Sequence, residues 1–126
     1  SLGLADRVQF LGQRDAELPV LYHAADVFVL PTIERSEAFA IVQLEAMAAG
    51  LPVVSSNAGA NAEAVAEGET GFLVTTPGEW SDRIARLAND AGLCRQMGET
   101  GRRRVETDYS LGPVFERLRC VIAGLA

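Results

Sequence analysis

Two glutamates stand eight residues apart in a stretch that is otherwise almost wholly apolar, SEAFAIVQLEAMAAGLPVV, residues 36–54. If this stretch is helical, Glu37 and Glu45 lie about two turns and ~12 Å apart with an angular offset of roughly 80°, so both can reach one elongated ligand. Carboxylates accept hydrogen bonds from hydroxyl groups. The pair therefore favours a ligand with sugar-like hydroxyls at both ends.

The residues around the start of this helix are small, namely Ser36, Ala38 and Ala40. Backbone N–H groups there can approach an anion closely, and the helix dipole favours negative charge at the same end. A diphosphate flanked by two polyols fits this span. The arrangement indicates a nucleotide sugar, with Glu37 at the transferred sugar, the helix start at the phosphates and Glu45 at the ribose.

Each glutamate taken alone has a simpler interpretation. Glu37 can be an acid favoured by the helix dipole, and Glu45 can be a surface position of an amphipathic helix. Glu45, however, lies between apolar residues in QLEAMAAG, and the turn that follows returns the helix to the sheet. An acid on so apolar a helix needs a partner.

The elements that must position these residues follow an α/β pattern, because short apolar runs alternate with segments of helical period. We expect strands over residues 8–11, 27–30, 53–55 and 71–74. We expect helices over residues 17–25, 39–49, 63–67, 79–89, 94–107 and 111–125. The apolar run 27–30 predicts burial on both faces of a parallel sheet. Gly50 and Pro52 end the helix that carries Glu45, and the loop 32–39 faces the crevice beyond the strand ends, where such sheets bind ligands.

Composition and charge narrow the class of protein. The chain has 126 residues, 48% hydrophobic and 22% charged, which predicts one globular domain. It has neither an apolar run of the ~20 residues that cross a bilayer nor a secretion signal, so we expect a cytoplasmic location. A net charge of -6 argues against a nucleic-acid partner. Cys94 and Cys120 form no CxxC pair and have no histidine cluster beside them, so we predict neither a zinc site nor a disulfide.

The remaining conspicuous residues have structural interpretations. The only histidine, His23, lies on a predicted helix away from the loop, and Trp80 is expected to pack at a helix start. The run 102–104 of three arginines fans out around a helix and is expected to be solvated. None of them is predicted to act in catalysis.

Four segments carry a family resemblance, in the order DRVQFLG, LYHAADVFVLP, SEAFAIVQLEAMAAGLPVVSS and GANAEAVAEGETGFLV. Together they resemble the carboxy-terminal, donor-binding domain of family-4 retaining glycosyltransferases of the GT-B fold, over essentially the whole chain. The most specific element is the motif of two acids separated by seven residues, followed by AMAAGLPVV. The segment GETGFLV is a secondary marker.

The resemblance implies an enzyme that moves a sugar from a nucleotide diphosphate sugar to a glycan, lipid or small-molecule acceptor with retained configuration. It implies that Glu37, at the catalytic position, binds hydroxyls of the transferred sugar and that Glu45 binds the ribose. The turn whose backbone amides meet the diphosphate corresponds to Phe39, Ala40 and Ile41. Gln13 and Arg14 fall where the family contacts the nucleobase. Such enzymes need no metal and no cofactor besides the donor substrate.

The chain also departs from the family pattern. Alanines stand where the family often has glycines, at Ala38, Ala40 and Ala60, and a methyl group at a phosphate-facing turn is expected to lower donor affinity. The family's upstream Arg and Lys, which neutralise the leaving diphosphate, have no match in the chain. The acceptor-binding N-terminal Rossmann domain has no match either.

We therefore expect residues 1–126 to be part of a Rossmann-like domain with an incomplete sheet, about four strands and about six helices. The helix 111–125 would pack toward the N-terminal domain, and the chain alone would be inactive. Peripheral membrane association of the parent protein is compatible with this but not indicated by the chain.

Two other function classes stay open. One is a non-catalytic scaffold or binding module that keeps the glycosyltransferase fold, which the alanines favour and the retention of both Glu37 and Glu45 disfavours. The other is an unrelated nucleotide-binding unit, which is disfavoured because no GxGxxG or P-loop sequence is present.

Overall fold

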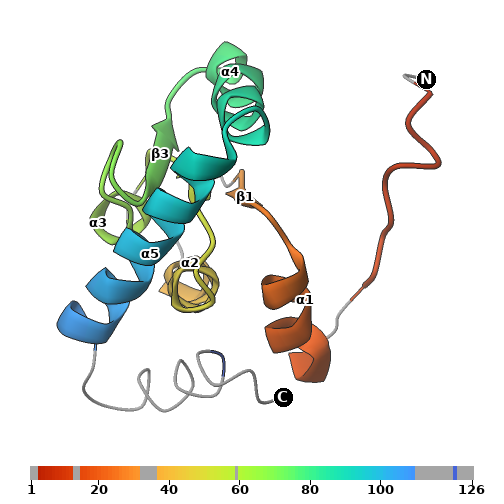
Figure 1. Ribbon diagram of the computed structural model, residues 1–126. Coiled ribbons are helices and arrows are strands. Elements are labelled where there is room, and N and C mark those ends of the chain that lie inside the picture. The colour runs from red at the N-terminus through yellow and green to blue at the C-terminus, as the bar shows by residue number, and fades with distance from the viewer. Residues whose placement is uncertain (1–2, 13–14, 32–36, 59, 110–120, 122–126) are drawn as a thin grey trace.

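The computed structural model describes residues 3–12, 15–31, 37–58, 60–109 and 121. The described elements are the 3-10 helix η1 (Asp15–Glu17), α1 (Leu18–Ala24), β1 (Phe28–Leu30), α2 (Glu37–Ala48), β2 (Val53–Ser56), α3 (Ala60–Ala64), β3 (Gly71–Val74), α4 (Pro77–Ala88) and α5 (Ala91–Asp108). Figure 1 shows the strands packed among the helices. The prediction of an α/β chain with a Rossmann-like parallel sheet is confirmed.

The sheet is parallel and has the order β1-β2-β3. In the central strand β2, Val53 and Val54 point to opposite faces and both are fully buried. In β1, by contrast, Val29 is 38% exposed. The prediction that the run 27–30 is buried on both faces is therefore wrong in this structure, because β1 pairs only with β2 within the described residues and lies at the edge of the sheet.

Helices cover the sheet on both sides. The face that carries Val53 packs in one core cluster with apolar residues of α1, α2 and α3. The face that carries Val54 and Phe72 packs in a second cluster with α4. Helix α5 contributes Met97 to the second cluster and Val105 to the first, so it joins the two layers. This layering is the usual consequence of right-handed parallel crossovers.

Helix α2 is rich in apolar residues, and part of it is enclosed by the rest of the domain. Its second half is almost wholly buried, from Gln43 to Ala48. Gly50 follows it with φ of 84°, the left-handed conformation that glycine adopts readily, and Pro52 leads into β2. The predicted end of this helix is confirmed, and its observed start lies two residues earlier than predicted.

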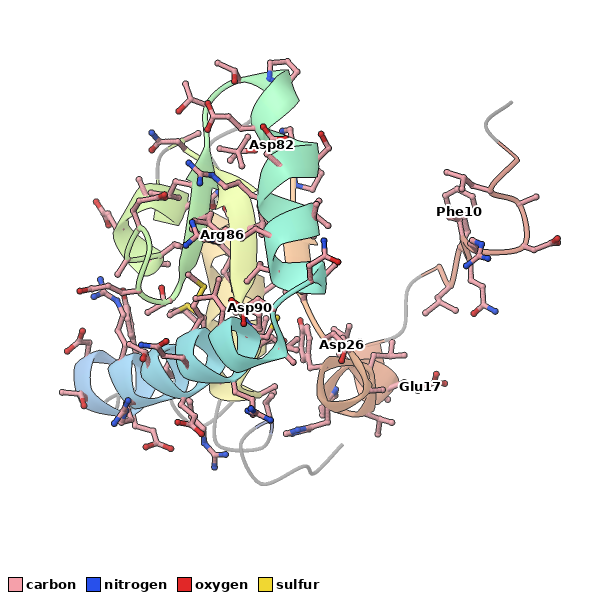
Figure 2. All side chains as sticks on the ribbon, turned by 45° about the horizontal axis from the view of Figure 1, so that its top comes forward. Phe10, Glu17, Asp26, Asp82, Arg86 and Asp90 are labelled. Atoms are coloured by element: carbon pink, nitrogen blue, oxygen red, sulfur yellow. The ribbon has the colours of Figure 1, made fainter. Side chains whose placement is uncertain are left out.

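The N-terminal segment contains no strand, contrary to the prediction for residues 8–11. Residues 3–12 run clear of the helices and the sheet in Figure 1, and Phe10, labelled in Figure 2, is 97% exposed. A strand needs a hydrogen-bonded neighbour to satisfy its backbone groups. No described strand lies beside this segment, so its apolar residues alone do not make it one.

Other boundaries differ by smaller amounts. The helix predicted at 63–67 lies at Ala60–Ala64, because the Thr70 hydroxyl accepts a hydrogen bond from the Ala66 amide and the chain turns at Gly68. The helix predicted at 111–125 lies outside the described residues apart from Val121. Among the helices that the structure describes, none is both long and apolar enough to cross a lipid bilayer.

Candidate functional site

Helix α2 starts at the edge of the sheet where the strands end. β1 ends at Leu30 and β2 ends at Ser56, and each is followed directly by the chain that leads to α2 or α3. The first turn of α2 contains Glu37, Phe39 and Ala40. Its backbone amides therefore point toward the carboxyl edge of the sheet, where open α/β sheets bind ligands.

The structure places the sequence-predicted site residues only in part. The side chains of Glu37, Phe39 and Ala40 lie outside the described set, whereas Ile41 is half-buried. Gln13 and Arg14, predicted at the nucleobase, lie wholly outside the described residues. Two of the predicted features lie on one helix. The start of α2 is followed, two turns later, by Glu45.

Glu45 is buried, with 2% of its surface exposed. Its Oε2 accepts a hydrogen bond from the hydroxyl of Tyr22 at 3.1 Å, across 23 residues of sequence. Its neighbours along the helix, Leu44 and Ala46, are buried and apolar. The interpretation of Glu45 as a surface position is therefore wrong, and the predicted need for a hydrogen-bonding partner is confirmed.

Tyr22 is held by its own contacts. It lies on α1, is 5% exposed, and meets the ring of Phe28 edge to face at a centroid distance of 6.0 Å. Its neighbour His23 contacts the Val121 carbonyl oxygen through Nε2 at 2.8 Å, which fits the packing role expected for this histidine. The sequence analysis did not single out Tyr22, although a phenol hydroxyl within a predicted helix is a group that could satisfy a buried acid.

A second buried polar pair joins α2 to α3. Gln43 Nε2 donates a hydrogen bond to Asn61 Oδ1 at 2.5 Å, and the two side chains are 0% and 3% exposed. Gln43 Oε1 is also buried and has no hydrogen-bond partner among the described residues. Sequence reasoning did not anticipate this pair, which ties together the helices that follow β1 and β2.

The loop after β2 leads into α3, which contacts α5. Glu63 is exposed on α3, and its backbone carbonyl accepts a hydrogen bond from Arg104 of α5 at 3.0 Å. Gly59 lies outside the described residues. The contact anchors α3 to α5 through the backbone of Glu63.

A cavity of about 680 Å³ lies at the opposite end of β1, where the strand begins. It is lined by Asp26, Val27, Ile84, Leu87, Ala88, Ala91, Cys94 and Arg95. Burial raises the pKa of the Cys94 thiol, and the carboxylates of Asp26 and Asp90 raise it further. Figure 2 shows both aspartates where α1 approaches the junction of α4 and α5. None of the predicted donor-binding residues lines this cavity.

Comparisons with known proteins agree with the family resemblance. The family model described as "Glycosyl transferases group 1" matches residues 1–104. The D-inositol 3-phosphate glycosyltransferase of Corynebacterium glutamicum (strain R) is 42% identical over 101 residues, which cover 78% of this chain and 24% of that protein. Spore coat protein SA of Bacillus subtilis (strain 168) is 35% identical over 117 residues, covering 90% of this chain and 30% of that protein.

A solved structure gives the same result. Sucrose-phosphate synthase from Thermosynechococcus elongatus superposes with a TM-score of 0.74 at 34% identity, covering 92% of this chain and 29% of that one. The chain spans about a quarter to a third of the length of these relatives. On the family match and on this likeness of sequence and fold, the chain belongs to the group 1 glycosyltransferases, which have the GT-B fold.

Proposed function

We propose that the chain is the donor-binding part of a retaining glycosyltransferase that moves a sugar from a nucleotide diphosphate sugar to an acceptor. Family membership supports sugar transfer as the reaction. The position of α2 supports the donor site, because this helix begins at the ligand-binding edge of the sheet and carries both glutamates. The acceptor would be bound by a part of the protein outside these 126 residues.

Each part of α2 has a role in this proposal. Glu37 accepts hydrogen bonds from hydroxyls of the transferred sugar. The backbone amides of Phe39, Ala40 and Ile41 hold the diphosphate. Together with the helix dipole, they stabilise the negative charge that develops as the diphosphate leaves. In this front-face displacement the acceptor approaches the sugar from the same face from which the diphosphate departs. Glu45 accepts hydrogen bonds from the ribose.

The observation that carries the proposal is the burial of Glu45 on an apolar helix. Burying a carboxylate costs free energy unless it is compensated, and an apolar residue at this position would pack α2 at less cost. Tyr22 donates one hydrogen bond to this carboxylate, and a role in ligand binding would account for an acid at a position where an apolar residue would pack. Because Glu45 is 2% exposed, donor binding has to uncover it, and this cost lowers the apparent affinity.

Isothermal titration calorimetry tests the proposal. Uridine, guanosine and adenosine diphosphate sugars are titrated into the chain and into the intact gene product that contains it. We expect heat with one base, and loss of that heat in Glu45→Ala. Glu99→Ala is the matched control, because Glu99 is an exposed glutamate on α5. Binding that survives Glu45→Ala contradicts the assignment of Glu45, and absence of heat with every donor favours the scaffold interpretation.

The stereochemical part needs turnover by the intact gene product. Proton NMR of the product reports the anomeric configuration of the transferred sugar. Retention of the donor's configuration supports the proposed front-face displacement, and inversion contradicts it.

A further inference from the structure

We infer that Tyr22 is a positioning residue that aims the Glu45 carboxylate at the ribose of the donor, an inference that rests on the proposed function. The Tyr22 hydroxyl donates to Glu45 Oε2 at 3.1 Å, and the two side chains are 5% and 2% exposed. The contact joins α1 to the third turn of α2. It is thus a buried contact between a neutral donor and the acid assigned to the ribose.

A glutamate at this position needs such a contact to point in one direction. Its side chain has three rotatable bonds, and ordering them costs conformational entropy. The Tyr22 hydroxyl supplies one such contact from a neighbouring helix. A hydrogen bond has a preferred length and direction, so the Tyr22 hydroxyl restrains where Oε2 lies.

The hydrogen-bonding capacity of the carboxylate allows a ligand to bind beside Tyr22 once Glu45 is uncovered. A carboxylate has acceptor sites for about four hydrogen bonds, so a bond from Tyr22 and bonds from ribose hydroxyls do not compete for one lone pair. A residue that fixes one oxygen of the carboxylate also fixes the plane and the direction of the other. Tyr22 therefore acts on the ligand through Glu45, without touching it.

Tyr22 is itself held by contacts, as a positioning residue has to be. Its ring meets Phe28 of β1 at a centroid distance of 6.0 Å and an interplanar angle of 64°. Helix α1 is further anchored where His23 meets the Val121 carbonyl. The Glu45 carboxylate is thus linked to the sheet through Tyr22 and Phe28, and this link restricts where the carboxylate can lie.

A purely structural role for Tyr22 makes a different prediction. If the hydroxyl only satisfies a buried acid, its removal lowers stability and leaves recognition of the ribose unchanged. If it aims Glu45, its removal weakens binding only for donors that have ribose hydroxyls. The discrimination between a donor and its 2′,3′-dideoxyribose analogue is therefore the decisive measurement, because a stability defect alone does not move it.

The experiment uses the intact gene product and measures kcat and KM for the donor and its dideoxyribose analogue. The variants are Tyr22→Phe, Glu45→Gln and the double variant. We expect the wild type to prefer the ribose donor by tenfold or more and Glu45→Gln to lose this preference. Tyr22→Phe should raise KM for the ribose donor about tenfold while kcat, and KM for the analogue, stay within a factor of about two. The double variant should be no worse than Glu45→Gln, because the two residues act through one contact.

The outcomes separate this inference from the proposal beneath it. A Glu45→Gln variant that keeps the preference for ribose overturns the role of Glu45 and with it the role of Tyr22. A preference that depends on Glu45 but survives Tyr22→Phe overturns the inference alone, and so does a Tyr22→Phe variant with a lower Tm and unchanged discrimination. If Tyr22→Phe does not fold, Phe28→Leu is the second variant, because it removes the ring that packs against Tyr22 and keeps the Tyr22 hydroxyl. A reduced preference for the ribose donor in this variant supports the inference. An unchanged preference overturns it.

Discussion

Gly98 of α5 packs directly against the carbonyl oxygen of Gly50, the residue that turns the chain out of α2. A Cβ atom at position 98 would overlap this backbone oxygen, so one of the two backbones would have to shift. One turn further along α5, a Cβ atom at Gly101 would make only ordinary van der Waals contact with Met47. The close approach of α5 to α2 therefore depends on the missing side chain at Gly98.

Replacing Gly98 by alanine should destabilise the chain. Overlap with a backbone atom forces the two helices apart, and overpacking of this kind costs about 1–3 kcal/mol even though alanine favours helix. Urea unfolding of Gly98→Ala measures the loss. Gly78→Ala is the control, because Gly78 lies in helix α4 with no atom near the position of its absent Cβ; we expect no destabilisation there. Equal unfolding midpoints for the two variants would contradict the close approach.

Breaking the Gln43–Asn61 hydrogen bond from one side should cost more than removing both side chains. Gln43→Leu leaves the buried Asn61 Oδ1 without its donor, which costs about 1–3 kcal/mol. The double variant Gln43→Leu/Asn61→Leu leaves neither partner unsatisfied and should recover most of this loss. A double-mutant cycle in urea measures the coupling. Asn57→Ala, at an exposed asparagine, is the control and should stay within about 0.5 kcal/mol. Additive losses at positions 43 and 61 would show that the bond is not formed.

Those parts of the fold that depend on neighbouring residues in the sequence were predicted correctly. Gly50 and Pro52 marked the end of α2, and the apolar run at Gly71–Val74 was predicted with the bounds that the structure has. The segment 8–11 has an equally good strand pattern and forms no strand. Strand formation depends on a neighbour, and a single sequence does not show whether one lies alongside.

The candidate site shows the same division. The spacing of Glu37 and Glu45 was visible because an α-helix converts sequence distance into a defined separation. The partner of Glu45 was not, because Tyr22 lies on another helix and nothing local joins the two. Burial of Glu45 was predictable only as a requirement for some partner, and packing decided which residue meets it.

Alkylation of Cys94 should be slow at mildly alkaline pH. Burial and the nearby Asp26 and Asp90 raise the pKa of the Cys94 thiol, so less of the reactive thiolate is present than in a free thiol. In a Cys120→Ser background, the rate with iodoacetamide should rise with pH to a midpoint above that of N-acetylcysteine. Asp90→Asn keeps an N-cap for α5 and should lower the midpoint, because it removes one negative charge. A midpoint at or below that of the free thiol would contradict this environment.

The first turn of α4 should become less stable in acid. The Thr76 hydroxyl donates to Glu79 Oε1 at 2.9 Å and holds the pKa of this carboxyl below its ordinary value. A carboxyl with a lowered pKa stabilises the fold above its unfolded-state pKa, and this stabilisation is lost as the pH falls through the folded-state pKa. In a carboxyl-detected NMR titration, Thr76→Val should therefore move the midpoint of Glu79 upward. Thr100→Val, on α5, should leave it unchanged.

The pH dependence of the stability of the same variants gives a second test of the Glu79 pKa. Because Thr76→Val brings the folded-state pKa of Glu79 nearer to its unfolded value, this variant should lose less stability than the wild type between neutral and acid pH. Urea midpoints measured across that range test the sign. A Thr76→Val variant that loses as much stability on acidification as the wild type, with an unmoved Glu79 midpoint, would mean that the threonine hydroxyl is not what lowers the pKa. The lowering would then have to come from the backbone amides of Thr75 and Thr76 and the charge of Arg83, which also act on this carboxyl.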